Sequence, residues 1–216
     1  HSKGTNTSFG SSSNIFLSDG LIGYWKFDEG VGSSSIDSSG NNKTATFATG
    51  DSSPSWSSAK FGIGLNFDGI NDYIPVTTST IFNTQTGFTI SLWAKTNTHN
   101  SEKTMAMTAG YNVGINNYNN KICITHWNTS NNRYTACENN TDTTTWHHYI
   151  GIYQGNSSNG KILLYKDGIL ENSTNITNPT SRSSFNIGGQ SNPVYAYNGY
   201  LDEIRIYNRA LSADEV

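Results

Sequence analysis

The chain ends in the stretch YNGYLDEIRIYNRALSADEV, residues 197–216, which joins a strand pattern to a short polar tail. Within it, YLDEIRIY (200–207) carries two adjacent acids, Asp202 and Glu203, followed by apolar residues at every second position. Neighbouring residues on a regular strand point to opposite faces of the sheet. We therefore expect the two acids to point apart, with Asp202 directed inward on the same side as Ile204.

Short runs with similar alternation recur along the chain, separated by Gly, Asn, Asp and Ser. None sustains the 3.6-residue period of a helix, apart from a short segment at the C-terminus. In YKDGIL an Asp-Gly pair joins two such runs, as in a tight hairpin turn. The pattern predicts an all-β fold with antiparallel sheets, either a sandwich or a barrel. The predicted strands are GLIGYWKF, LNFDG, DYIPV, FTISLWAKT, YNVGIN, KICITHW, RYTACE, HHYIGIYQ, KILLYKDG, SFNIGG and YLDEIRIY.

The length of 216 residues favours a single domain for an all-β chain. We expect this domain at residues 21–216, after a polar linker or cloning remnant at residues 1–20. Charged residues make up 13 % of the chain and the net charge is −3, with no basic run. Nucleic-acid and anionic-membrane partners depend on clustered Lys and Arg and are therefore not expected. No stretch approaches the roughly 20 apolar residues of a membrane span, so membrane insertion is not expected either.

The two cysteines, Cys123 and Cys137, flank the hairpin-like stretch CITHWNTSNNRYTAC. Across such a hairpin they would face each other on neighbouring strands, close enough for a disulfide. A disulfide is the preferred interpretation and a free pair is the alternative. The disulfide would indicate an oxidising compartment, and hence a secreted or cell-surface protein.

Several motifs occur in an order that resembles the laminin-G-like domains of the concanavalin A-like lectin/glucanase superfamily. The opening is GLIGYWKFDEGVGSSSIDSSGNNKTATF, followed by WSSAKFGIGLNFDGINDYIPV, FTISLWAKT, TWHHYIGIY, ILLYKDGIL and FNIGG, and the close is YNGYLDEIRIYNRALSADEV. The resemblance covers nearly all of the chain after about residue 20. The segment at residues 101–144 matches poorly, so we expect binding specificity to lie there.

This resemblance implies a two-sheet antiparallel β-sandwich, a jelly roll of the concanavalin A-like type. Such domains occur mostly in extracellular multidomain proteins, so other domains of a larger secreted protein are expected neighbours. The family implies binding of glycans or proteins far more often than catalysis.

Catalytic carboxylates are not expected in this chain. Glucanases of the superfamily place their acids at alternating strand positions, and a retaining pair needs carboxyl groups about 5 Å apart. Asp202 and Glu203 are adjacent, as are Asp28 and Glu29, so each pair would be split between two faces. His147 and His148 are interpreted as strand residues with local hydrogen bonds. The protein is therefore not expected to be an enzyme.

A structural calcium ion is expected where the first and last strands meet. An inward Asp202 needs a cation, because a buried carboxylate without a partner is costly. Related domains hold calcium between these strands, and Ca²⁺ takes six to eight oxygen ligands. The alternative is an Asx turn at Asp37 together with Asp202 paired to an arginine. The expected calcium ligands are Asp28, Gly30, Asn41, Asn42 and Asp202.

The acids of FDGINDYI, Asp68 and Asp72, are interpreted as turn formers rather than as a second calcium site.

Trp127 is the strongest candidate for ligand binding, because it lies in the unusual hairpin beside an Asn-rich turn. An exposed aromatic ring can stack on the apolar face of a sugar, while Asn side chains bind its hydroxyls. Trp93 and Trp146 are expected in the core, and Trp25 and Trp56 at its rim. The alternative for each aromatic residue is a place between the sheets. The predicted ligand-binding residues are Trp127, His126, Tyr111, Asn112, Tyr118 and Tyr134, with Tyr195 and Tyr197 as further candidates.

These observations predict a non-catalytic extracellular module that binds carbohydrate, such as a cell-surface or matrix glycan, and carries a structural calcium ion. A protein-binding adhesion module without glycan binding is the alternative, and a glycoside hydrolase is the third, disfavoured hypothesis.

Overall fold

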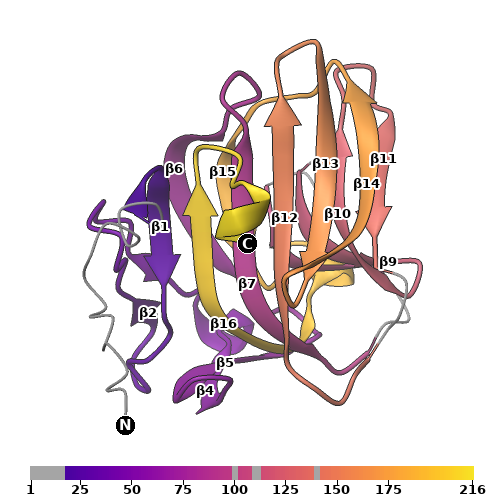
Figure 1. Ribbon diagram of the computed structural model, residues 1–216. Coiled ribbons are helices and arrows are strands. Elements are labelled where there is room, and N and C mark those ends of the chain that lie inside the picture. The colour runs from indigo at the N-terminus through magenta and orange to yellow at the C-terminus, as the bar shows by residue number, and fades with distance from the viewer. Residues whose placement is uncertain (1–17, 99–101, 109–112, 139–141) are drawn as a thin grey trace, which may run out of the picture.

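Two antiparallel sheets packed face to face make up most of the computed structural model, which describes residues 18–98, 102–108, 113–138 and 142–216 (Figure 1). The predicted antiparallel β-sandwich is therefore confirmed. The first strand begins at Leu21. Most of the predicted linker lies outside the described residues, so the boundary between linker and domain stays a prediction.

The larger sheet has eight strands within the described residues, in the order β14-β13-β12-β7-β16-β5-β4, and β1 also pairs with β16. Its strands are β1 (Leu21–Trp25), β4 (Ser55–Ser58), β5 (Ile63–Asp68), β7 (Phe88–Thr96), β12 (His147–Gly155), β13 (Asn159–Lys166), β14 (Ile169–Thr177) and β16 (Asn198–Tyr207).

The smaller sheet has six strands within the same residues, in the order β11-β10-β9-β8-β15-β6. Its strands are β6 (Ile74–Phe82), β8 (Lys103–Met107), β9 (Val113–Tyr118), β10 (Lys121–Trp127), β11 (Arg133–Cys137) and β15 (Arg182–Ile187). A short hairpin and three single-turn 3-10 helices complete the described elements: β2 (Ser34–Ser35), β3 (Ala45–Thr46), η1 (Gly50–Ser52), η2 (Pro193–Tyr195) and η3 (Ala213–Glu215).

The core lies between the two sheets and follows from strand alternation. On β7 the inward residues Phe88, Ile90, Leu92 and Ala94 are each no more than 1 % exposed. Burying one large apolar side chain contributes about 1.5–3 kcal/mol to folding. On β12, Gly151 lets the sheets approach closely, because a Cβ there would lie 2.5 Å from Ile124 Cδ1 of the opposite sheet.

The central strand β16 pairs with β7 along one edge and with two different strands along the other. β5 pairs with its first half, up to Leu201, and β1 pairs with its second half, from Ile204 onward. A β-bulge lies between these halves, and Glu203 there adopts a left-handed φ of 54°. Leu201 and Ile204 both point into the core, so the bulge resets the alternation.

The two acids of β16 consequently share the outer face of the larger sheet. Asp202 lies opposite Trp93, whose chain neighbours point into the core, so Trp93 and Asp202 both point outward. Glu203 contacts Tyr24 and Arg205 on the same outer face. The expectation that Asp202 points inward with Ile204, and that the acids face apart, is wrong. Simple alternation holds only for an unbulged strand.

The C-terminal segment lies across the outer face of the larger sheet (Figure 1). Leu211 packs there against a small apolar cluster that includes Ile150, Ile152 and Tyr207. Arg209 forms an ion pair with Glu215, and Ser212 caps η3. This segment therefore covers apolar side chains that would otherwise be exposed on that face.

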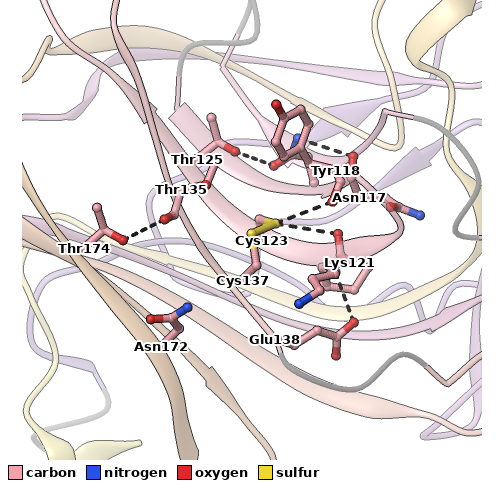
Figure 2. Close-up of a disulfide and its surroundings, with 12 residues drawn as sticks. Asn117, Tyr118, Lys121, Cys123, Thr125, Thr135, Cys137, Glu138, Asn172 and Thr174 are labelled. Atoms are coloured by element: carbon pink, nitrogen blue, oxygen red, sulfur yellow. Dashed lines mark hydrogen bonds between the residues drawn. A yellow bond between two sulfur atoms is a disulfide. The ribbon is translucent and has the colours of Figure 1, made fainter.

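A disulfide joins Cys123 of β10 to Cys137 of β11, which are directly opposed in the antiparallel ladder. The predicted pairing is confirmed. Figure 2 shows this bond beside β14, whose Thr174 donates a hydrogen bond to the Thr135 carbonyl. The next residue, Glu138, is fully buried and accepts a hydrogen bond from Lys166 Nζ at 3.0 Å.

We expect the double variant Cys123→Ala/Cys137→Ala to fold with lower stability. Removing a cross-link that closes a loop of this size costs about 3 kcal/mol, chiefly because the unfolded chain gains freedom. Urea unfolding monitored by tryptophan fluorescence measures the loss. Wild type treated with a reducing agent should lose the same amount. Equal midpoints for variant and wild type would contradict the expectation.

Candidate functional site

Asp202 occupies the point where β1 ends and β5 begins on the edge of β16. Its side chain is fully buried, and Oδ2 accepts a hydrogen bond from the Phe61 amide at 2.9 Å. The second oxygen, Oδ1, has no hydrogen-bond partner among the described residues. Burial raises the pKa of Asp202 to about 7, with further contributions from the charges of Glu203 and Asp28. An ionised carboxylate in this place is incompletely stabilised.

Asp28 and the turn at residues 59–62 converge on the same point. A Cβ at Gly62 would lie 3.2 Å from Asp28 Oδ1, and one at Gly64 would lie 3.5 Å from the Asp202 carboxyl carbon. Phe27 next to Asp28 has a φ of 59°, so a strained residue adjoins each acid. We call Asp28, Asp202 and this turn the strand-end site.

Arginine does not neutralise Asp202 within the described residues. Arg205 instead pairs with Glu203 and donates to the Tyr24 hydroxyl at 2.7 Å. Arg209 pairs with Glu215 and Asp19. The alternative in which Asp202 meets an arginine is therefore wrong.

The predicted ligands Asn41 and Asn42 lie in an exposed turn that contacts the start of β1, away from Asp202. The Asn41 amide donates to the Leu21 carbonyl at 3.0 Å, and Leu21 pairs with Tyr207, at the other end of the β1–β16 ladder from Asp202. Asp37 holds this turn, with its carboxylate accepting the amides of Tyr24, Ser39 and Lys43. The structure thus brings Asp28 and Asp202 together without Asn41 and Asn42. The Asx turn at Asp37 is confirmed.

Gly30 lies two residues beyond Asp28, with a φ of 69°, and a Cβ there would be 3.9 Å from Ile63. It therefore lies close to the start of β5, beside the strand-end site. In the other acidic segment, Asp72 accepts the Asp68 amide and Asp68 accepts the Ile70 amide, as expected for a turn.

Trp127 lies on the outer face of the smaller sheet, directly opposite Arg133. The Arg133 guanidinium is 3.7 Å from the ring centroid of Tyr118 and 5.8 Å from that of Trp127, and it forms an ion pair with Glu102. We call Trp127, Arg133 and Tyr118 the Trp127 platform. Two polar side chains on the same face, Asn116 and Thr125, are buried and lie 2.7 Å apart.

His126 and Tyr134, two other members of the predicted ligand-binding set, are not on this platform. His126 is fully buried, with its ring 5.9 Å from that of Phe88 and 5.3 Å from that of Tyr153. Burial lowers the pKa of His126 to about 4, so the ring is neutral near pH 7. Tyr134 lies opposite His126 and packs against the core, where Tyr197 is also fully buried. Tyr111 and Asn112 lie outside the described residues.

The other aromatic and histidine side chains also differ in place from the expectation. Trp25 is fully buried in the core rather than at its rim, whereas Trp56 packs at the edge of the core as expected. Trp93 and Trp146, expected in the core, are half-buried on the outer face of the larger sheet. The two histidines make local hydrogen bonds as interpreted: His147 with Asp142 and Asp167, and His148 with Ser91.

Comparison of sequences decides the family. Residues 68–216 match the family model described as the concanavalin A-like lectin/glucanases superfamily. The chain belongs to this superfamily. The match confirms the resemblance recognised from the motifs. No curated protein matches the sequence of this superfamily member significantly.

Solved structures similar to this superfamily member include toxin binding domains. The binding domain of Paraclostridial Mosquitocidal Protein 1 aligns with a TM-score of 0.70 and 16 % identity over 92 % of this chain and 51 % of that chain. The receptor binding domain of botulinum neurotoxin D aligns with a TM-score of 0.66 and 16 % identity over 92 % of this chain and 51 % of that chain. The botulinum neurotoxin serotype G binding domain aligns with a TM-score of 0.69 and 16 % identity over 90 % of this chain and 49 % of that chain. The chain thus spans about half the length of these structures and shares their fold.

The helices of the described residues include none with the length and apolar character of a membrane span.

Arg133 was not among the predicted ligand-binding residues, although the spacing of the two cysteines could have pointed to it. Once Cys123 and Cys137 are paired, counting inward along the hairpin places Trp127 opposite Arg133. The long side chain of Arg133 can then reach both aromatic rings. The disulfide therefore predicts the register, and the register predicts the platform.

We expect the stability of the domain to fall as pH falls from about 6.5 to about 4. His126 binds protons more weakly in the folded state, with a pKa of about 4, than in the unfolded chain, where the ordinary value is 6.5. Burial likewise lowers the pKa of His148 to about 4. The contribution of the two histidines is therefore complete above the unfolded value and is lost through this window, and it outweighs the opposite contribution of Asp202, whose pKa is raised to about 7.

Urea midpoints measured between pH 7.5 and 4.5 test this expectation. His126→Phe should reduce the loss on acidification, whereas the control Tyr134→Phe should keep the wild-type dependence. An identical pH dependence in His126→Phe and wild type would contradict the assignment to His126.

Proposed function

We propose that this domain is a non-catalytic, extracellular recognition module that binds carbohydrate and carries a structural calcium ion. The Trp127 platform is the observation that carries the proposal. The disulfide supports an oxidising, extracellular location.

The platform combines the two kinds of group that sugars require. The Trp127 ring offers an apolar surface for the C–H face of a sugar. Arg133, whose side chain is 17 % exposed and whose Nη2 binds Glu102, would offer its Nη1 to a hydroxyl oxygen. Tyr118 and Glu102 hold Arg133 in place, so little side-chain freedom is lost on binding. The platform lies on a sheet face rather than on a loop tip, which favours a shallow, preorganised site.

The surroundings of the acids support a non-catalytic role. Asp202 is fully buried beneath the turn at residues 59–62, and Glu203 accepts hydrogen bonds from Tyr24 and Arg205. Although the bulge places both on one face, Asp202 is closed to substrate and Glu203 is engaged. Catalysis by two carboxylates requires both to reach one glycosidic bond.

Calcium would bind at the strand-end site through the unpartnered Oδ1 of Asp202 and the nearby carboxylate of Asp28. Ca²⁺ prefers carboxylate and carbonyl oxygens, and water can complete its six to eight ligands. Backbone carbonyls near Gly30 and in the turn at residues 59–62 would supply further oxygens. The bound ion would neutralise the two acids and hold β1 and β5 together at β16.

Calcium should raise the thermal midpoint of the wild-type domain over that in EDTA. A ligand that binds only the folded state stabilises it by about 2.7 kcal/mol at 100 times its Kd. Asp202→Asn should remove most of this response, and the control Asp51→Asn, at an exposed acid in η1, should keep it. Equal midpoints with calcium and EDTA in the wild type would rule out a structural calcium ion.

A glycan array should detect binding by the wild-type domain, and Trp127→Ala should weaken it at least about tenfold. Loss of one stacking ring at the platform removes apolar contact worth about 1.5–3 kcal/mol. Ile169→Ala, at an exposed apolar residue of the β13–β14 turn, is the control and should bind as wild type. Silence of the array at high protein concentration, or unchanged binding by Trp127→Ala, would contradict the proposed site.

Protein binding is the second candidate function. Ile169 and Leu170 are 67 % and 48 % exposed at the β13–β14 turn, where a partner protein could cover them. A defined protein partner in a pull-down, lost in the Ile169→Ala variant while glycan arrays stay silent, would favour this candidate.

A further inference from the structure

The outer face of the larger sheet contains a hollow of about 170 Å³, on the opposite side of the sandwich from the Trp127 platform. It is lined by Ser57, Ser58, Lys95, Trp146 and Tyr200. None of these residues belongs to the ligand-binding set expected from the sequence. This volume is below the roughly 300–1,000 Å³ of a typical ligand pocket, so the hollow suits one sugar ring rather than an extended chain.

Three neighbouring strands hold the walls of this hollow in register. Tyr200 of β16 pairs with Lys95 of β7 on one side and with Asn66 of β5 on the other. Trp146 directly precedes β12, and its ring centroid lies 6.2 Å from that of Tyr200 at an interplanar angle of 55°. The two rings form an angled corner, and Ser57 and Ser58 of β4 line the hollow beside it.

Two lysines of this region, Lys60 and Lys95, have no acidic partner among the described residues. Lys95 Nζ lies 6.0 Å from the Tyr200 ring centroid, and Lys60 Nζ lies 4.3 Å from that of Trp93. Neither lysine makes an ion pair in the part of the chain that the structure describes. Of the nearby acids of β16, Asp202 is buried beneath the turn at residues 59–62, and Glu203 pairs with Arg205. Lys95 thus gives the wall of the hollow one positive charge without an acidic partner in the described part of the chain.

We propose that this hollow binds a single carboxylate-bearing sugar residue, a uronic or sialic acid. The sugar ring packs into the corner between Trp146 and Tyr200, and its carboxylate meets Lys95. Ser57 and Ser58 bind its hydroxyls. The inference shares the ligand class of the proposed function but uses a separate face of the sandwich, so each can fail alone.

Isothermal titration with galacturonate, N-acetylneuraminate and neutral galactose tests the proposal. The wild type should bind at least one of the two acids saturably, and more tightly than galactose. Lys95→Met and Trp146→Ala should each weaken that binding at least about tenfold, because each removes one of the two main contacts. Lys95→Arg should restore part of the affinity, because it keeps the charge.

Control variants separate this hollow from the Trp127 platform. Lys121→Met, at an exposed lysine near the platform, and Trp127→Ala should both bind the acidic sugar as wild type. Thermal melting of each variant verifies that it is folded. The proposal is overturned if neither acid binds saturably, if galactose binds as tightly as the acids, or if folded Lys95→Met binds as wild type. Loss of binding in Trp127→Ala alone would assign the acidic sugar to the platform instead.

Discussion

The pairing of β16 with two different strands along one edge is the constraint on which the rest of the structure depends. β5 and β1 meet end to end beside it, and one regular ladder cannot serve both. The bulge at Asp202 and Glu203 absorbs the mismatch, with Glu203 in a left-handed conformation that costs on the order of 1–3 kcal/mol. Core burial on both halves of β16, at Leu201, Ile204 and Ile206, offsets that cost.

This arrangement places a buried charge where three chain segments converge. The end of β1, the start of β5 and the bulge together enclose Asp202, whose Oδ2 accepts the Phe61 amide while Oδ1 has no hydrogen-bond partner among the described residues. A buried carboxylate with so few hydrogen bonds lowers the stability of the fold, and the surrounding segments keep it in place. Such a position suits an ion that would join the segments, and it suits catalysis poorly because substrate has no access.

The two outer faces of the sandwich differ in how their cations are arranged. On the smaller sheet, Arg133 is fixed by Glu102 and stacks on Tyr118, which makes a preorganised and nearly neutral surface. On the larger sheet, Lys60 and Lys95 lie over aromatic rings without acidic partners among the described residues. Because alternate strand residues fill the core, the outward residues are free to differ between faces, and each face can recognise a different ligand.

The sequence by itself determined most of the strands, though not β4 or β8, and also the Asp167–Gly168 turn, the antiparallel class and the disulfide, because alternation, turn chemistry and hairpin register are local properties. It also contained the pairing of Trp127 with Arg133, through the register that the cysteines set. Only the tertiary structure decided the direction of Asp202, the burial of His126 and the outward place of Trp146. Each of these depends on which distant strand lies alongside, and a bulge forced by two such partners leaves no mark on local periodicity.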